Sequence, residues 1–148
     1  MNLDSLIDEV IIVTSDDYEK CVLFMIHCLP LIADACPEIG GQGIRSATQY
    51  WIDESIDQAE LERMRVECWN YLDANSASTN LEKPEFCAIR AVICVLYSEP
   101  QSDDNGELLD WFFKMLTSIY IDTEKLMNDL KGVMEEFIVI NGVGVKLS

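Results

Sequence analysis

The sequence predicts an all-α fold, a single-domain bundle of six to seven helices, and three observations support this prediction. Apolar residues recur at intervals of three and four along almost the whole chain, which is the period of an amphipathic helix. Only seven glycines and four prolines interrupt the 148 residues. Hydrophobic residues make up 49% of the chain, and a domain of this length buries roughly 70% of its unfolded surface. We therefore expect a helical domain over residues 1–137, followed by a C-terminal tail or hairpin over residues 138–148.

Two helices are expected before a glycine-rich segment. The first spans about Leu3 to Val13, and Ser15 has the side chain of an N-cap for the second. Pro30 lies in the apolar run of the second helix. It is expected to kink or split that helix, because proline removes a backbone donor and clashes with the preceding turn. Residues 36–43, CPEIGGQG, are expected to break the helical pattern as a helix–helix turn.

The third helix is expected over about Ile44 to Ile52, and the fourth has the clearest start signal in the chain. Asp57 precedes the fourth helix and Glu60 stands three residues on, which is close to the capping-box pattern. Trp69 falls in the apolar stripe of this helix and is expected to be buried.

Three more helices are expected in the second half. Residues 73–83 are polar and form the longest predicted loop, and Pro84 suits the first turn of the fifth helix. That helix is apolar almost all round apart from Arg90, so we expect it to be central. It is expected to end at Glu99-Pro100.

The sixth helix is expected to follow a turn over residues 101–106 and to run to Tyr120, with Trp111 on its inward face. Asp122 is expected to cap the seventh helix. The Asn-Gly pair at residues 141–142 lies between β-branched residues, which is a strong hairpin signal.

The N-terminal residues contain neither the basic segment nor the uninterrupted apolar segment of a secretory signal. The longest apolar stretch, residues 21–33, is 13 residues long, whereas a membrane span needs roughly 20. Five of the six cysteines lie inside apolar helical patterns, where a free cysteine behaves as a small hydrophobe. We therefore expect reduced thiols and a cytoplasmic protein that does not insert into a membrane.

The chain carries 10 Lys plus Arg against 27 Asp plus Glu, a formal net charge of −17. This balance argues against direct binding to nucleic acid or to anionic membrane, because both are held mainly by clustered Lys and Arg. Solubility needs a net charge of only roughly 2 to 8 in magnitude, and a larger charge destabilises the compact state through self-repulsion. The excess therefore indicates a use, and we infer electrostatic capture of a basic protein partner.

Two groups of carboxylates are denser than the rest, one at the start of the fourth helix and one at the start of the sixth. They consist of Asp53, Glu54, Asp57 and Glu60, and of Asp103, Asp104, Glu107 and Asp110. Acids are locally favourable at helix N-termini, so helix capping is one interpretation and a partner-binding patch is the other. Tyr50 is a candidate aromatic anchor beside the first group. Trp51 is a second candidate, although core packing is its other interpretation.

No residue pattern indicates catalysis, a metal or a cofactor. His27 is the only histidine, and its apolar neighbours in an acidic protein disfavour an activated Cys–His pair. No two cysteines have the spacing of a zinc site. We therefore expect a protein that is not an enzyme, although an enzyme that uses carboxylates alone stays an alternative.

Three stretches resemble helical immunity proteins of bacterial polymorphic-toxin systems, which include the Rhs, type VI-secreted and contact-dependent types. The stretches are CPEIGGQG at residues 36–43, RVECWNYL at residues 65–72 and AIRAVIC at residues 88–94. The resemblance implies a stoichiometric inhibitor that binds one cognate toxin, often a nuclease, and blocks its active site.

The leading hypothesis is therefore a cytosolic immunity protein that neutralises a cognate, basic secreted toxin by occluding its active site. The alternative is an acidic DNA mimic or regulatory adaptor that binds a basic protein partner. No cofactor and no metal are expected in either case. Trp, Tyr and Phe are frequent enough to supply an interface as well as a core, so a homo-oligomer stays open.

Overall fold

The chain folds as an all-α bundle, as the sequence predicts. A computed structural model describes residues 2–76, 82–101 and 103–141, and these residues form seven α-helices, one 3₁₀ segment and no strand. The elements are α1 (Leu3–Thr14), α2 (Tyr18–Cys28), the 3₁₀ segment η1 (Leu29–Ala35), α3 (Glu38–Trp51), α4 (Gln58–Ala74), α5 (Pro84–Ile93), α6 (Asn105–Ile119) and α7 (Thr123–Asn141).

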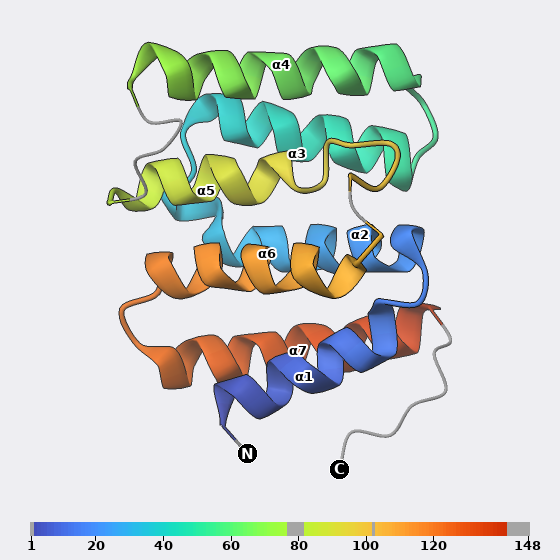
Figure 1. Cartoon of the computed structure of the whole chain (residues 1–148), viewed down its shortest axis with the longest axis vertical. Coiled ribbons are helices and arrows are strands. Elements are labelled where there is room, and N and C mark those ends of the chain that lie inside the picture. The colour runs from blue at the N-terminus through green and yellow to red at the C-terminus, as the bar shows by residue number, and fades with distance from the viewer. Residues whose placement is uncertain (1, 77–81, 102, 142–148) are drawn as a thin grey trace.

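The helices lie in two layers with their axes across the long axis of the molecule (Figure 1). In that view α5, α6 and α1 lie in front of α3, α2 and α7, and α4 closes the top of the stack. The two layers contact each other through the pairs α3 and α5, α2 and α6, and α1 and α7. Helices alternate in direction, so α2, α4 and α6 all begin at the same end of the bundle, on the right in Figure 1.

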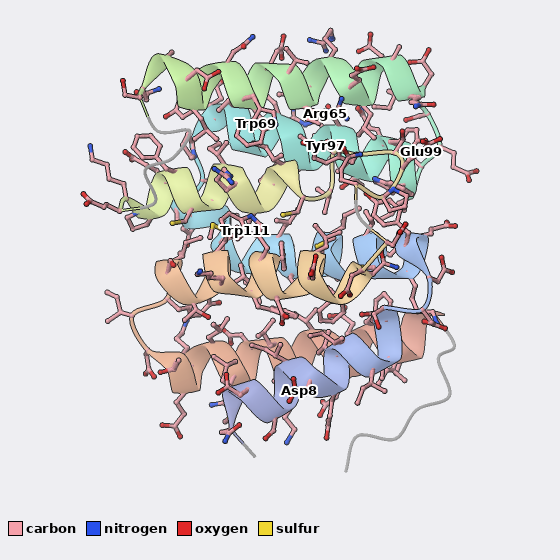
Figure 2. The ribbon with its side chains drawn as sticks, viewed as in Figure 1. Asp8, Arg65, Trp69, Tyr97, Glu99 and Trp111 are labelled. Carbon is pink, nitrogen blue, oxygen red and sulfur yellow. The ribbon has the colours of Figure 1, made fainter. Side chains whose placement is uncertain are left out.

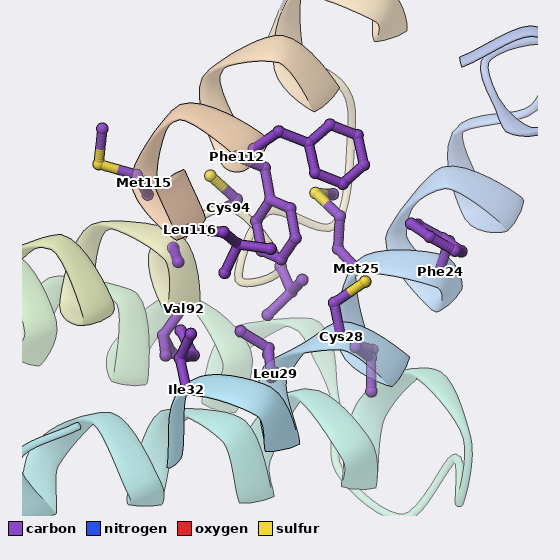
Figure 3. Packing of buried hydrophobic residues seen from close by; sticks show 14 of the residues in the cluster. Phe24, Met25, Cys28, Leu29, Ile32, Val92, Cys94, Phe112, Met115 and Leu116 are labelled. Carbon is purple, nitrogen blue, oxygen red and sulfur yellow. The ribbon is translucent and has the colours of Figure 1, made fainter. Parts of the chain in front are cut away.

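The core is centred on α5, which confirms the prediction from its all-round apolar sequence. Every residue of the range Phe86–Ile93 is buried except Arg90. Side chains of α2, η1, α5 and α6 meet in this core, and Met25, Val92 and Phe112 among them are fully buried (Figure 3).

Pro30 divides the second predicted helix, as expected. The α-helix α2 ends at Cys28, and the chain continues from Leu29 as the 3₁₀ segment with Pro30 in its first turn. A 3₁₀ segment tolerates the proline there because the first turn of a helix has backbone N–H groups without intrahelical partners.

The N-cap predicted for this helix is wrong, because Asp17 takes the role expected of Ser15. Asp17 has extended backbone, and its carboxylate accepts a hydrogen bond from the Glu19 N–H at 3.1 Å. Ser15 instead ends α1, where its N–H donates to the Ile11 carbonyl at 2.9 Å. The first turn of α2 therefore begins two residues later than Ser15 would place it.

The break predicted over residues 36–43 is also wrong, because α3 begins at Glu38 and contains all of the glycines of that segment. Gly40 and Gly43 are buried at the contact with α5. A Cβ atom at Gly43 would lie only 2.6 Å from Cγ1 of Val92. These two glycines therefore permit close helix packing and do not form a turn.

α5 ends at Ile93, well before the predicted stop at Glu99-Pro100. The three consecutive carbonyls of residues 95–97 leave the helix and accept hydrogen bonds from side chains of three other helices. The donors are Trp51 to Val95 at 3.0 Å, Arg65 to Leu96 at 3.5 Å and Tyr18 to Tyr97 at 2.7 Å. Because a buried carbonyl needs a partner, these bonds allow the helix to stop early.

α7 begins as predicted and ends later than predicted. The Asp122 carboxylate accepts a hydrogen bond from the Glu124 N–H at 3.0 Å, which confirms it as the cap. The helix continues to Asn141, so residues 138–141 are helical and do not form the first strand of a hairpin. Phe137 is fully buried and Ile138 packs against the core, which extends the apolar stripe of the helix past the boundary expected at residue 137. Residues 142–148 lie outside the described residues.

Candidate functional site

Most of the carboxylates singled out in the sequence come together at one end of the bundle, because α4 and α6 begin there (Figure 1). The linker between α5 and α6 joins the two groups: Glu99 and Gln101 line a depression together with Gln58 and Glu62 of α4. The start of α6 also contacts the turn between α1 and α2, since Asn105 Nδ2 donates to the Ser15 carbonyl at 2.9 Å. We call this surface the acidic end.

The acidic end also contains carboxylates that the sequence analysis did not single out. They lie at the start of α2 and in the linker after α5. The carboxylates of the helix starts and linkers that meet at this end are Asp16, Asp17, Glu19, Asp53, Glu54, Asp57, Glu60, Glu99, Asp103, Asp104 and Glu107. Their convergence depends on the alternating helix directions, which no local sequence signal reports.

Asp110 is separated from the rest of its predicted group. It lines a different depression, between α6 and α1, together with Asp4, Asp8 and Lys114. Asp110 therefore lies toward α1 and is not part of the acidic end.

Helix capping accounts for two of the predicted carboxylates. The Asp57 carboxylate accepts a hydrogen bond from the Glu60 N–H at 2.9 Å. The Asp104 carboxylate accepts from the N–H groups of Gly106 and Glu107 at 2.9 and 3.3 Å. These bonds satisfy backbone donors that have no partner inside the helix, so both residues have a structural role.

Four other carboxylates at this end have no such role. Asp53, Glu54, Asp103 and Glu107 are exposed, and their side chains make no hydrogen bond or ion pair with the described residues. Glu54 adopts a φ of 53°, in the left-handed region, within the turn that joins α3 to α4. Because a non-glycine residue rarely adopts this conformation, the turn is held by its surroundings. The Ser55 N–H donates to the Gln49 carbonyl at 2.8 Å.

The cations near the acidic end are already paired. Lys20 contacts Asp16 at 3.2 Å, and Arg63 lies between Glu60 at 3.2 Å and Glu67 at 2.8 Å. The hydrogen bond with Glu60 and the charge of Glu67 raise the pKa of Arg63. The surplus carboxylates therefore face solvent without neutralisation by these cations.

The aromatic residues at this end mainly hold the structure together. Trp51 is half-buried and contacts Tyr18 edge-on, with ring centroids 6.0 Å apart. Tyr50 packs perpendicular to Trp51 at 5.0 Å and is itself half-buried. Together with the Trp51 hydrogen bond to the Val95 carbonyl, these contacts favour the core-packing interpretation of Trp51. They leave Tyr50 with only part of its ring available to a partner.

Beside the acidic end lies a cavity of about 280 Å³ between α4, α5 and α6. We call it the aromatic cleft. Trp69 of α4 and Trp111 of α6 lie on either side of α5 (Figure 2). Both tryptophans are half-buried, so the prediction that they are core residues is only partly right. Their remaining surface forms the walls of this cavity.

Arg90 lies against both tryptophans of the aromatic cleft. Its guanidinium carbon is 4.9 Å from the ring centroid of Trp69 and 5.1 Å from that of Trp111. Such cation–π contacts favour the half-buried position of this charge within the apolar part of α5. Ile93 and Leu108 continue the apolar lining away from Arg90.

Two carboxylates also line the aromatic cleft. Asp104 and Glu107 lie at the start of α6, where the cleft meets the acidic end. The lining therefore combines apolar surface with one cation and two carboxylates. Among the described residues that line the cavity, the charged ones are Arg90, Asp104 and Glu107.

The only thiol that lines the aromatic cleft is Cys94, and its surroundings keep it protonated. Burial raises the pKa of Cys94 to about 12, so the reactive thiolate is scarce at neutral pH. His27 is elsewhere: its Nδ1 atom is 2.7 Å from the Leu23 carbonyl, and its ring contacts Phe137 edge-on. The lining of the cleft therefore favours binding of a ligand over nucleophilic chemistry.

Within the described part of the chain, no three His, Cys, Asp or Glu side chains are arranged to hold a metal ion. No helix there combines the length and apolar character that crossing a membrane requires. Comparisons with protein-family models, with curated proteins and with solved structures find no match to this chain.

Proposed function

We propose that the protein is an immunity protein, a cytoplasmic inhibitor that binds a basic toxin domain through the acidic end and covers its active site. The observation that carries this proposal is the convergence of unneutralised carboxylates from the starts of α4 and α6 beside the aromatic cleft. The resemblance of residues 36–43, 65–72 and 88–94 to helical immunity proteins supports the class.

Charge placement of this kind acts first on the rate of association. Complementary charges raise association rate constants from about 10⁵–10⁶ to as much as about 10⁸–10⁹ M⁻¹s⁻¹ at low salt. An inhibitor that must reach a toxin before the toxin reaches its substrate benefits from that gain. Nucleic-acid-cleaving domains are basic because they bind phosphates, so they match an acidic surface in sign.

The test is co-expression of the chain with the product of the reading frame immediately upstream of its gene, scored by growth and by co-purification. The wild type is expected to restore growth and to bind the toxin. A variant with Asp53→Lys, Glu54→Lys and Asp103→Lys is expected to lose both effects. These positions leave the capping residues Asp57 and Asp104 unchanged.

The matched control reverses three exposed carboxylates at the other end of the bundle: Asp34→Lys, Glu38→Lys and Asp73→Lys. It changes the net charge by the same amount and is expected to protect as well as the wild type. Equal loss in both variants would show that only total charge matters. If the wild type gives no protection and co-purifies with a DNA-binding regulator instead, the DNA-mimic alternative replaces this proposal.

A further inference from the structure

We infer that the aromatic cleft receives one apolar side chain, the size of Phe or Leu, from a basic segment of the protein partner. This inference rests on the proposed function and deepens it, because it assigns the anchor point of the complex. The argument uses the size of the cleft, its lining and the charges on its rim.

The size of the cleft favours a single side chain. Its volume of about 280 Å³ lies just below the range of about 300–1,000 Å³ that is typical of small-molecule sites. A side chain that enters from a partner fills such a space while its backbone stays outside. Interfaces concentrate their binding energy in well-packed pockets of this kind, and Trp, Tyr and Arg are the residues most enriched there.

The lining of the cleft selects an apolar occupant. Ile93, Leu108 and the exposed parts of the two tryptophans supply the apolar lining, and Ile93 is only 4% exposed. A cationic side chain at this depth would approach the Arg90 guanidinium, and like charges repel strongly where water is excluded. An apolar side chain instead adds contact area to rings whose orientation Arg90 already fixes.

The rim of the cleft selects basic neighbours for that side chain. Glu107 and Asp104 line the cleft, and Glu99 lines the adjacent depression of about 180 Å³, where Arg65 pairs with Glu62 at 3.3 Å. Acidic residues beside the inserted side chain would be repelled by Glu99, Asp104 and Glu107, whereas Lys or Arg would be attracted. A second copy of this chain is disfavoured for the same reason, since it carries a net charge of −17.

The experiment is an NMR titration of the intact protein with three capped pentapeptides. They are Lys-Lys-Phe-Lys-Lys, Lys-Lys-Ala-Lys-Lys and Glu-Glu-Phe-Glu-Glu. The indole N–H signals of Trp69 and Trp111 report on the cleft. The indole signal of Trp51 serves as an internal reference, because its N–H is bonded to the Val95 carbonyl.

The basic Phe peptide is expected to shift the Trp69 and Trp111 signals. The Ala peptide should bind at least about tenfold more weakly and leave those signals in place, and the acidic peptide should shift neither. Trp111→Phe should preserve binding of the Phe peptide because it keeps a ring in the wall, whereas Trp111→Ala should weaken it at least about tenfold. If Trp111→Ala does not fold, the three titrations of the wild type still decide the question.

The inference is overturned if the Phe peptide leaves both indole signals unchanged, or if the Ala or acidic peptide shifts them equally. Its failure can be told apart from failure of the proposed function. One outcome is that the indole signals do not shift, whereas both basic peptides shift the backbone amide signals of Asp53, Glu54 and Asp103. That outcome retains electrostatic capture and rejects insertion into the cleft. If these amide signals shift with neither basic peptide, electrostatic capture itself is rejected.

Discussion

Carboxylates at the acidic end fall into two chemical roles that the residue type alone does not distinguish. Asp57 and Asp104 accept backbone hydrogen bonds at the starts of α4 and α6, so their charge serves the fold. Asp53 and Asp103 stand a few residues away without such bonds, so their charge is available to a partner. Capping therefore applies to Asp57 and Asp104, and partner binding is proposed for their uncapped neighbours in the same groups.

Replacement of Asp57 by Ala is expected to lower the free energy of unfolding by about 1 kcal/mol, because the Glu60 N–H loses its acceptor. Asp53→Ala is the matched control and should change it by less than about 0.5 kcal/mol, because its side chain is exposed. Urea denaturation measures both variants. Equal effects would refute the division of roles.

Gly43→Ala is expected to destabilise the protein by about 1–3 kcal/mol, because the added Cβ would lie 2.6 Å from Val92 Cγ1 in the centre of the bundle. Gly41→Ala should instead stabilise it by about 0.5–1 kcal/mol, because a Cβ at that helical position meets no atom within 4 Å. The urea concentration at the midpoint of unfolding should be lower than that of the wild type for Gly43→Ala and higher for Gly41→Ala. Movement of both to higher urea would contradict the packing role of Gly43.

At the scale of elements, the local signals in the sequence predict the helices well. Asp57, Asp122 and Pro84 mark helix starts, and Pro30 marks a break, because each acts on the backbone of its own segment. Elements whose limits depend on distant contacts could not be predicted in this way. α5 stops at Ile93 because side chains of α2, α3 and α4 bind the next carbonyls, and those helices are distant in sequence.

The candidate site also combines features that local sequence signals predict with features that depend on distant contacts. Its carboxylates could be found in the sequence, since they are dense at two predicted helix starts. The aromatic cleft could not, because Trp69 and Trp111 have the helical spacing of ordinary core residues and become cleft walls only through the packing of α4 and α6 on α5. The available signal in the sequence was Arg90, the one charged residue within the apolar stretch from Phe86 to Ile93, whose position needed an explanation.

Buried thiols of α2, of α4 and of the C-cap of α5 are expected to make the free energy of unfolding depend on pH in the alkaline range. Burial raises the pKa of Cys21, Cys68 and Cys94 from 9.0 to about 12. The unfolded chain loses these protons near pH 9, whereas the folded chain keeps them, so this contribution to stability is full below pH 9 and is lost between pH 9 and 12.

Between pH 9 and 11, the free energy of unfolding is therefore expected to fall, each buried thiol contributing up to about 1.4 kcal/mol per pH unit. Cys68→Ala removes one of these groups and should make the fall less steep, even if the cavity lowers stability at pH 7. Urea denaturation at successive pH values gives both slopes. A slope that Cys68→Ala leaves unchanged would contradict the assignment to buried thiols.

At the scale of the whole molecule, the net charge of −17 is arranged by the topology. Because helix directions alternate, the starts of α2, α4 and α6 bring their acidic first turns to one end of the bundle (Figure 1). The cost of this arrangement is self-repulsion, which caps and the ion pairs of Lys20 and Arg63 reduce only in part. The benefit is a negative electrostatic potential that is concentrated at one end of the bundle, beside the aromatic cleft.

The most direct test of capture by the acidic end is the rate constant for association with the co-purified toxin domain. Stopped-flow fluorescence measures this rate constant across salt concentrations. The wild-type rate should fall at least about tenfold between about 20 and 500 mM NaCl, because salt screens the attraction. At low salt, the Asp53, Glu54 and Asp103 charge-reversal variant should associate at least about tenfold more slowly. The opposite-end variant at Asp34, Glu38 and Asp73 should stay within about twofold. Equal low-salt rates for all three proteins would contradict capture by the acidic end.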